Sequence, residues 1–155
     1  LGDVYKRQVY SLLNIIKDSK SNLSLSIVGA EKNSSDKIVQ NNVNIYEVES
    51  NEQNLIKFYD DHNIFILPSF TEGHPMVLLE SLARLRPVII FKDIEHVIEN
   101  KKGIFIAERN SISFLKVINQ IKENYKSIQQ EMMANKLPTK EQFLKNFSEL
   151  ISKTS

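Results

Sequence analysis

Three short and nearly continuous apolar runs place the strongest constraint on how this chain can fold. They lie within Ile64–Ser69, Pro87–Phe91 and Gly103–Ala107 and read IFIL, VII and IFIA. Strands with apolar side chains on both faces are typical of a parallel sheet covered by helices. Two further β-branched runs, Leu23–Gly29 and Val43–Val48, precede them. The pattern predicts a parallel sheet of short, buried strands.

Segments with helical periodicity lie between these runs and around them. In each segment, apolar residues recur every three or four positions and form one face. The segments are Val9–Lys17, Asn51–Asp61, Met76–Leu85, Ile112–Ile121 and Lys140–Ile151. Because strands and helices alternate, we expect an α/β fold with a Rossmann-like, doubly wound parallel sheet. Ligands of such sheets bind in the crevice beyond the carboxyl ends of the strands.

The composition is that of an ordinary globular domain and excludes several classes of function. The chain is 41% hydrophobic and 25% charged, and its net charge of +1 does not favour a nucleic-acid partner. It has no cysteine, which excludes disulfides, thiol catalysis and cysteine-bound zinc. No apolar run approaches the roughly 20 residues of a transmembrane helix. We expect a cytoplasmic location, with peripheral membrane association of the full-length protein left open.

The first eight residues require separate treatment. The string DVYKRQ, Asp3–Gln8, resembles the translation of a transposase adaptor used to prepare sequencing libraries. The alternative is a genuine, polar start of the first helix. We expect residues 1–8 to be adaptor-derived and residues 9–155 to form the domain of a longer protein. No function is therefore assigned to Leu1–Gln8.

The turn after the third strand carries the richest set of chemical groups. Its sequence is SFTEGHPMVLLES, Ser69–Ser81, and it leads from a buried strand into a helix. Gly73 permits either close approach of a ligand to the backbone or a backbone angle that other residues avoid. Pro75 suits the first helical position, where a missing N–H costs nothing.

The start of this helix predicts a site for a phosphate-like anion. The free N–H groups of Met76 and Val77 would point into the crevice, where the helix dipole adds positive potential. Glu72 in the loop and Glu80 on the helix place two carboxylates beside this site. Carboxylates accept hydrogen bonds from hydroxyl groups. A ligand that combines phosphate with hydroxyls therefore fits better than bare phosphate.

The block IFILPSFTEGHPMVLLESLARLRPVII resembles the signature of retaining GT-B glycosyltransferases of family 4. The shared elements are a strand, Pro-Ser, E-G-x-P-x-x-x-x-E and a helix that ends before a Pro-Val-Ile strand. The similarity extends over nearly everything after Val9 and corresponds to the C-terminal domain of the GT-B fold. Spacing alone is uninformative, because two glutamates eight positions apart occur three times: Glu72/Glu80, Glu123/Glu131 and Glu141/Glu149.

The resemblance implies transfer of a sugar, with retention, from a nucleoside-diphosphate sugar to an acceptor such as a surface glycan or glycolipid. Glu72 would be the catalytic residue beside the reacting carbon, and Glu80 would hold the ribose hydroxyls. Further donor-binding positions would be Gly73, His74, Pro75, Met76 and Val77. No metal or other cofactor is implied. The acceptor would bind through an N-terminal domain absent from this chain, so the fragment alone is expected to be inactive.

Several positions depart from the family pattern. The family usually has an Arg and Lys pair before the first helix, which Lys6 and Arg7 do not replace. It has a glycine where this chain has Leu85–Arg86, and a Gly-Gly loop followed by Ile-Pro-Glu where this chain has Lys92–His96. These departures favour, as the alternative function, a degenerate GT-B module that binds or interacts without catalysis.

The histidines and paired carboxylates leave further interpretations open. We interpret His74 as a loop residue that lines the pocket rather than as an acid or base. A turn at the entry to a strand explains His62 better than metal binding does. His96 is a candidate for contact with phosphate or acceptor. A hydrolase that uses Glu72 and Glu80 as an acid/base pair is another alternative, although a pair beside an anion site suits binding better.

Overall fold

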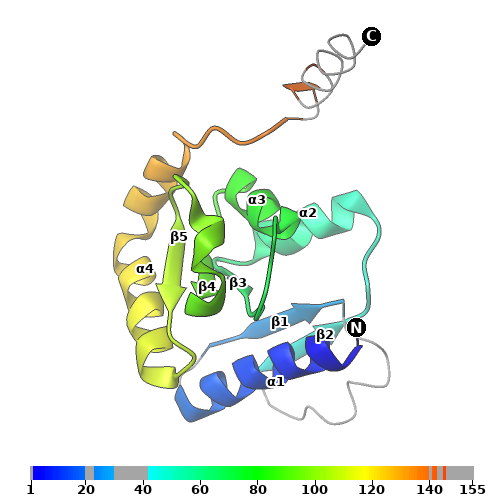
Figure 1. Cartoon of the computed structure of the whole chain (residues 1–155), viewed down its shortest axis with the longest axis vertical. Coiled ribbons are helices and arrows are strands. Elements are labelled where there is room, and N and C mark those ends of the chain that lie inside the picture. The colour runs from blue at the N-terminus through cyan, green and yellow to red at the C-terminus, as the bar shows by residue number, and fades with distance from the viewer. Residues whose placement is uncertain (1, 20–22, 30–41, 140, 143–144, 146–155) are drawn as a thin grey trace.

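The computed structural model describes residues 2–19, 23–29, 42–139, 141–142 and 145. From Val43 onward, strands and helices alternate as predicted (Figure 1). The elements are α1 (Gly2–Ser19), β1 (Leu25–Val28), β2 (Val43–Tyr46), α2 (Glu52–Asp61), β3 (Phe65–Leu67), α3 (Met76–Ala83), β4 (Val88–Phe91), the 3-10 helix η2 (Lys92–Ile98), β5 (Ile104–Ala107) and α4 (Ser111–Met132). The predicted helix Lys140–Ile151 lies almost entirely outside the described residues.

Every strand pair is parallel, which confirms the predicted α/β class. The strands form two separate sheets rather than one, with β1 beside β2 and the order β3-β4-β5 in the second sheet. Leu25 of β1 is in register with Val43 of β2, and Phe65 of β3 is in register with Val88 of β4. Strand β3 is short because Pro68, which follows it, has no N–H to extend the ladder.

The core is built around β4. All four of its residues, from Val88 to Phe91, have no exposed surface. Its neighbours β3 and β5 are buried less completely, and Ile106 of β5 is 40% exposed, because each lies at an edge of the three-stranded sheet. The prediction of burial on both faces therefore holds fully for the central strand only.

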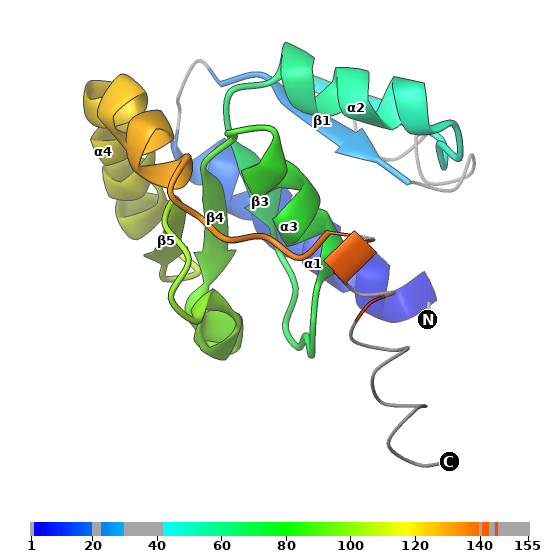
Figure 2. The same ribbon diagram turned by 90° about the horizontal axis from the view of Figure 1, so that it is seen from above.

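Helices cover the sheets and connect them. Helix α4 lies along β5 on one side of the molecule, whereas β1 and α2 lie on the other (Figure 2). Helix α1 contributes to two hydrophobic clusters. Leu12 packs in the larger cluster around β4, and Leu13 packs with Ile27 of β1 in a smaller cluster. The two sheets are therefore joined through side chains of one amphipathic helix.

Helix boundaries follow local capping. Asn51 accepts a hydrogen bond from the Asn54 amide (3.2 Å) at the start of α2, and Asn110 accepts one from the Ser113 amide (2.9 Å) at the start of α4. Helix α4 extends to Met132, beyond the predicted end at Ile121. Asn124 interrupts the apolar periodicity there and has non-helical backbone angles, but the apolar face resumes at Ile128.

Gly103, just before β5, has a backbone conformation that would be strained for other residues. Its φ is +87°, and a Cβ there would overlap the side chain of Met132, which is 2% exposed. We predict that Gly103→Ala lowers the free energy of unfolding by about 1–3 kcal/mol. Urea unfolding measures this, with Gly73→Ala as the control, because a Cβ at Gly73 meets nothing within 4 Å. An equal loss in both variants would contradict the assignment.

Candidate functional site

The residues that follow β3, β4 and β5 gather at one edge of the three-stranded sheet, because the carboxyl ends of parallel strands lie together. They are the loop 68–75, the start of η2 at Lys92 and Asp93, and the segment 108–110. Lys92 Nζ lies 3.6 Å from Glu108 Oε1, and Arg109 Nε lies 2.7 Å from Asp93 Oδ2. These contacts join the start of η2 to the segment 108–110.

The start of α3 is open, as the sequence predicts. Met76 is 57% exposed and Val77 40% exposed, so the described part of the chain leaves the first turn accessible. The prediction that Pro75 takes the first helical position is wrong by one residue, because its ψ of 108° is extended and makes it the N-cap before Met76. The Pro75 carbonyl accepts a hydrogen bond from the Leu78 amide at 3.2 Å. Among the described residues, the amides of Met76 and Val77 have no acceptor and remain available to an anion.

Gly73 leaves space in front of this helix start. Its φ is outside the left-handed region, so the alternative that Gly73 is needed for an unusual backbone angle is wrong. A Cβ there would meet no atom within 4 Å. What glycine leaves at this position is therefore open space rather than a special turn.

Glu72 is held by two neighbours. The buried hydroxyl of Ser69 donates to Glu72 Oε1 at 2.6 Å, and His96 Nε2 lies 2.8 Å from the Glu72 carbonyl oxygen. His96 comes from η2, so the loop after β3 is tied to the element after β4. Among the described residues, the second carboxylate oxygen of Glu72 has no partner. The carboxylate is thus oriented by the protein and can still accept a hydrogen bond.

Glu80 is oriented by Tyr59, a residue for which the sequence suggested only a place on the apolar face of its helix. The Tyr59 hydroxyl reaches from α2 and donates to Glu80 Oε2 at 2.9 Å. Burial raises the pKa of Tyr59, and the hydrogen bond to the Glu80 carboxylate raises it further. A tyrosine among apolar helix positions was the available signal, because a half-buried hydroxyl usually finds a partner.

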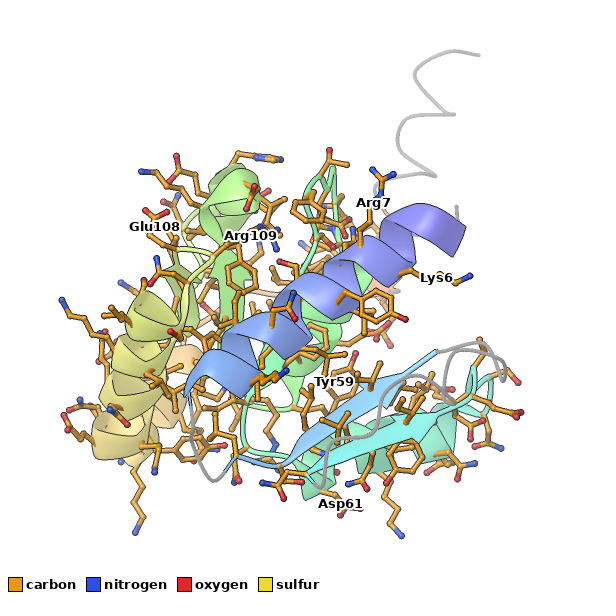
Figure 3. The ribbon with its side chains drawn as sticks, turned by 90° about the horizontal axis from the view of Figure 1, so that it is seen from below. Lys6, Arg7, Tyr59, Asp61, Glu108 and Arg109 are labelled. Carbon is orange, nitrogen blue, oxygen red and sulfur yellow. The ribbon has the colours of Figure 1, made fainter. Side chains whose placement is uncertain are left out.

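Arg109 is the second residue that the sequence did not reveal. It follows β5, and its side chain is 18% exposed. The guanidinium donates to the carbonyl oxygens of Pro68 and Ser69 and pairs with Asp93. Figure 3 shows it beside Glu108 at the same edge of the molecule. No motif marks this residue, because its partners lie far away along the chain.

The remaining histidines are placed as follows. His74 and His96 line a small hollow beside the start of α3, together with Pro75 and other residues of the loop and η2. His62 is the C-cap residue of α2, and its Nδ1 lies 2.7 Å from the Phe58 carbonyl oxygen, which agrees with the interpretation as a turn. The described ranges hold no group of three or more His, Asp or Glu side chains suited to a metal ion.

Comparison with known proteins matches this chain to one enzyme family. The pattern of the glycosyl transferases group 1 covers residues 5–138. An uncharacterized glycosyltransferase of Haemophilus influenzae is 34% identical over 58 residues, which are 36% of this chain and 16% of that protein. The chain therefore aligns with a small part of this relative. Within the described residues, no helix combines the length and apolar character needed to cross a membrane.

The Tyr59–Glu80 hydrogen bond predicts a pH dependence of stability. The pKa of Tyr59 is higher in the folded chain than in the unfolded chain, so its stabilising effect is complete below about pH 10 and is lost as pH rises further. Tyr59→Phe should lower the free energy of unfolding by about 1 kcal/mol at pH 7. It should also make the decline between pH 9 and 11 shallower than in the unmodified protein.

Urea unfolding at several pH values in this range measures the decline. The control is Tyr10→Phe, which removes the hydroxyl of an exposed tyrosine and should leave the decline unchanged. If Tyr59→Phe and the unmodified protein lost stability equally between pH 9 and 11, the pKa of Tyr59 would not be raised in the folded chain.

Proposed function

This chain belongs to the glycosyl transferases group 1, and we propose that it is the donor-binding, C-terminal domain of a retaining GT-B glycosyltransferase. Its donor would be a nucleoside-diphosphate sugar. The observation that carries the proposal is the open start of α3, where two amides without an acceptor in the described part of the chain lie in the same short unit as Glu72 and Glu80. This combination offers donors to a diphosphate and acceptors to sugar hydroxyls.

The diphosphate would bind at the start of α3. The amides of Met76 and Val77 would donate to its oxygens, and the helix dipole favours the negative charge. During transfer, the bond between the anomeric carbon and the diphosphate breaks, and its electron pair leaves with the diphosphate. An acceptor hydroxyl oxygen bonds to the same carbon, and its proton passes to the departing diphosphate. Fixed donors that meet this growing charge lower the barrier without reorganising during the reaction. The same groups would therefore serve both binding and departure of the nucleotide.

The two glutamates would bind the two sugars of the donor. Glu72, oriented by Ser69, would lie beside the transferred sugar and its positively charged anomeric carbon in the transition state. Glu80 would accept hydrogen bonds from the ribose, since Tyr59 occupies only one of its carboxylate oxygens. Gly73 leaves the approach clear, and His74 and Pro75 would line the donor site. Each carboxylate accepts a hydrogen bond from a different protein hydroxyl, that of Ser69 for Glu72 and that of Tyr59 for Glu80. This arrangement suits separate roles for the two glutamates.

The acceptor, a surface glycan or glycolipid, would bind through a second domain that lies N-terminal to this one in the full-length protein. Transfer would then occur in the cleft between the two domains. The cytoplasmic location remains an expectation from the composition, and the absence of a metal or other cofactor remains an expectation from the family resemblance. Neither is needed for the roles given to Glu72, Glu80 and α3.

Removal of the Glu80 carboxylate tests the proposed donor site. In the full-length protein, Glu80→Ala should weaken binding of the donor by about 100-fold or more, because two hydrogen bonds to a charged group are lost. Isothermal calorimetry with UDP-glucose, GDP-mannose and ADP-glucose measures this. Glu123→Ala is the matched control, since Glu123 has the same spacing to Glu131 but lies on α4.

Three outcomes would contradict the proposal. Unchanged affinity in Glu80→Ala would remove the role assigned to this residue. If the unmodified protein bound none of the sugar nucleotides and none of the free nucleotides UDP, GDP and ADP, the degenerate module would be favoured. Release of free sugar without an acceptor, lost in both Glu72→Gln and Glu80→Gln, would favour the hydrolase.

A further inference from the structure

We propose that Arg109 is a positioning residue that fixes Glu72 in the donor site. This inference rests on the proposed function, because it concerns how one carboxylate of that site is held. Arg109 itself is not assigned a contact with the donor. Its role follows from three contacts that connect the ends of β3, β4 and β5.

The Arg109 guanidinium acts as a fork between segments. Its Nε lies 2.7 Å from Asp93 Oδ2 in η2, and its Nη1 lies 3.2 Å from the Pro68 carbonyl oxygen. Its Nη2 donates to the Ser69 carbonyl oxygen. All three guanidinium nitrogens are therefore engaged within the protein. A planar group with donors in several directions can make these contacts at once.

Two aromatic rings hold the plane of the guanidinium. Its central carbon lies 3.9 Å from the ring centre of Phe70 and 4.4 Å from that of Phe91. Phe91 is fully buried at the end of β4, and it stacks on Phe114 of α4. The rigid core therefore determines the position of Arg109, and Arg109 in turn determines the position of the loop that contains Phe70.

One of the two contacts that hold Glu72 begins at a residue that Arg109 contacts directly, and the other begins in η2, which Arg109 contacts through Asp93. Ser69 accepts from Arg109 through its carbonyl oxygen and donates through its hydroxyl to Glu72 Oε1 at 2.6 Å. His96, which contacts the Glu72 carbonyl oxygen at 2.8 Å, lies three positions after Asp93 in η2, beyond the non-helical backbone of Ile94. The side chain of Glu72 is thus positioned through Ser69, which the guanidinium holds directly.

Loss of the Arg109 contacts should affect only the part of the donor site that contains Glu72. Tyr59 holds Glu80 from α2, and the amides of Met76 and Val77 belong to α3 itself. Neither feature depends on Arg109. We therefore expect a displaced Glu72 to weaken contact with the transferred sugar, whereas contact with the nucleotide should persist. A general loss of folding would weaken both.

Arg109→Lys is the direct test, because it keeps the charge but cannot reach all three acceptors. Ser69→Ala is the second variant, since it removes only the hydroxyl that reaches Glu72. Arg84→Lys is the matched control: Arg84 also forks onto a carboxylate, that of Asp60, but at the other end of α3. Calorimetry on the full-length protein would compare UDP, GDP and ADP with UDP-glucose, GDP-mannose and ADP-glucose.

The expected result is a split between the two kinds of ligand. Arg109→Lys and Ser69→Ala should bind the free nucleotide within about twofold of the unmodified protein and the sugar nucleotide at least about tenfold more weakly. Arg84→Lys should change neither. Unchanged affinity of Arg109→Lys for the sugar nucleotide would overturn the inference. An equal loss for both ligands would do the same.

Hydrogen exchange separates this inference from the proposed function. Amides of residues 69–73 should exchange faster in Arg109→Lys than in the unmodified protein, whereas those of the core strand β4 should not change. If the unmodified protein binds no nucleotide, the proposed function fails, and the exchange rates still report whether Arg109 holds this loop. Equal exchange in the two proteins would show that it does not.

Discussion

Burial of β4 on both faces is the constraint on which the rest of the structure depends. With no exposed surface from Val88 to Phe91, this strand must have a partner on each side and helices above and below. Because both partners are parallel to it, the segments that follow all three strands meet at one edge. The loop that contains Glu72, the start of η2 and Arg109 are neighbours for this reason. The candidate site is thus a consequence of how the core is filled.

The sequence predicted the features that depend on local pattern. Apolar runs predicted the strands, and Gly73 and Pro75 next to a helical period predicted an open helix start, which the exposure of Met76 and Val77 confirms. The roles of Glu72 and Glu80 stay predictions. Arg109 and Tyr59 could not be predicted in the same way. Arg109 contacts Pro68 across 41 positions, and Tyr59 contacts Glu80 across 21, so no short motif contains either pair.

Two departures from the family pattern have physical counterparts in the fold. Where the family has a glycine after the helix, Leu85 has a φ of +55°, a conformation that costs a residue with a Cβ about 1–2 kcal/mol. Leu85 is also packed against the main core, which offsets part of this cost. Where the family has a glutamate, His96 contacts the Glu72 carbonyl oxygen. The altered residue therefore still supports the loop that carries Glu72.

A crystal structure of the full-length protein with its sugar nucleotide would test the central claim most directly. We expect diphosphate oxygens within about 3 Å of the Met76 and Val77 amide nitrogens. We also expect the ribose at Glu80 and the transferred sugar at Glu72. A diphosphate bound elsewhere, with the first turn of α3 left in contact with solvent, would contradict the proposed donor site.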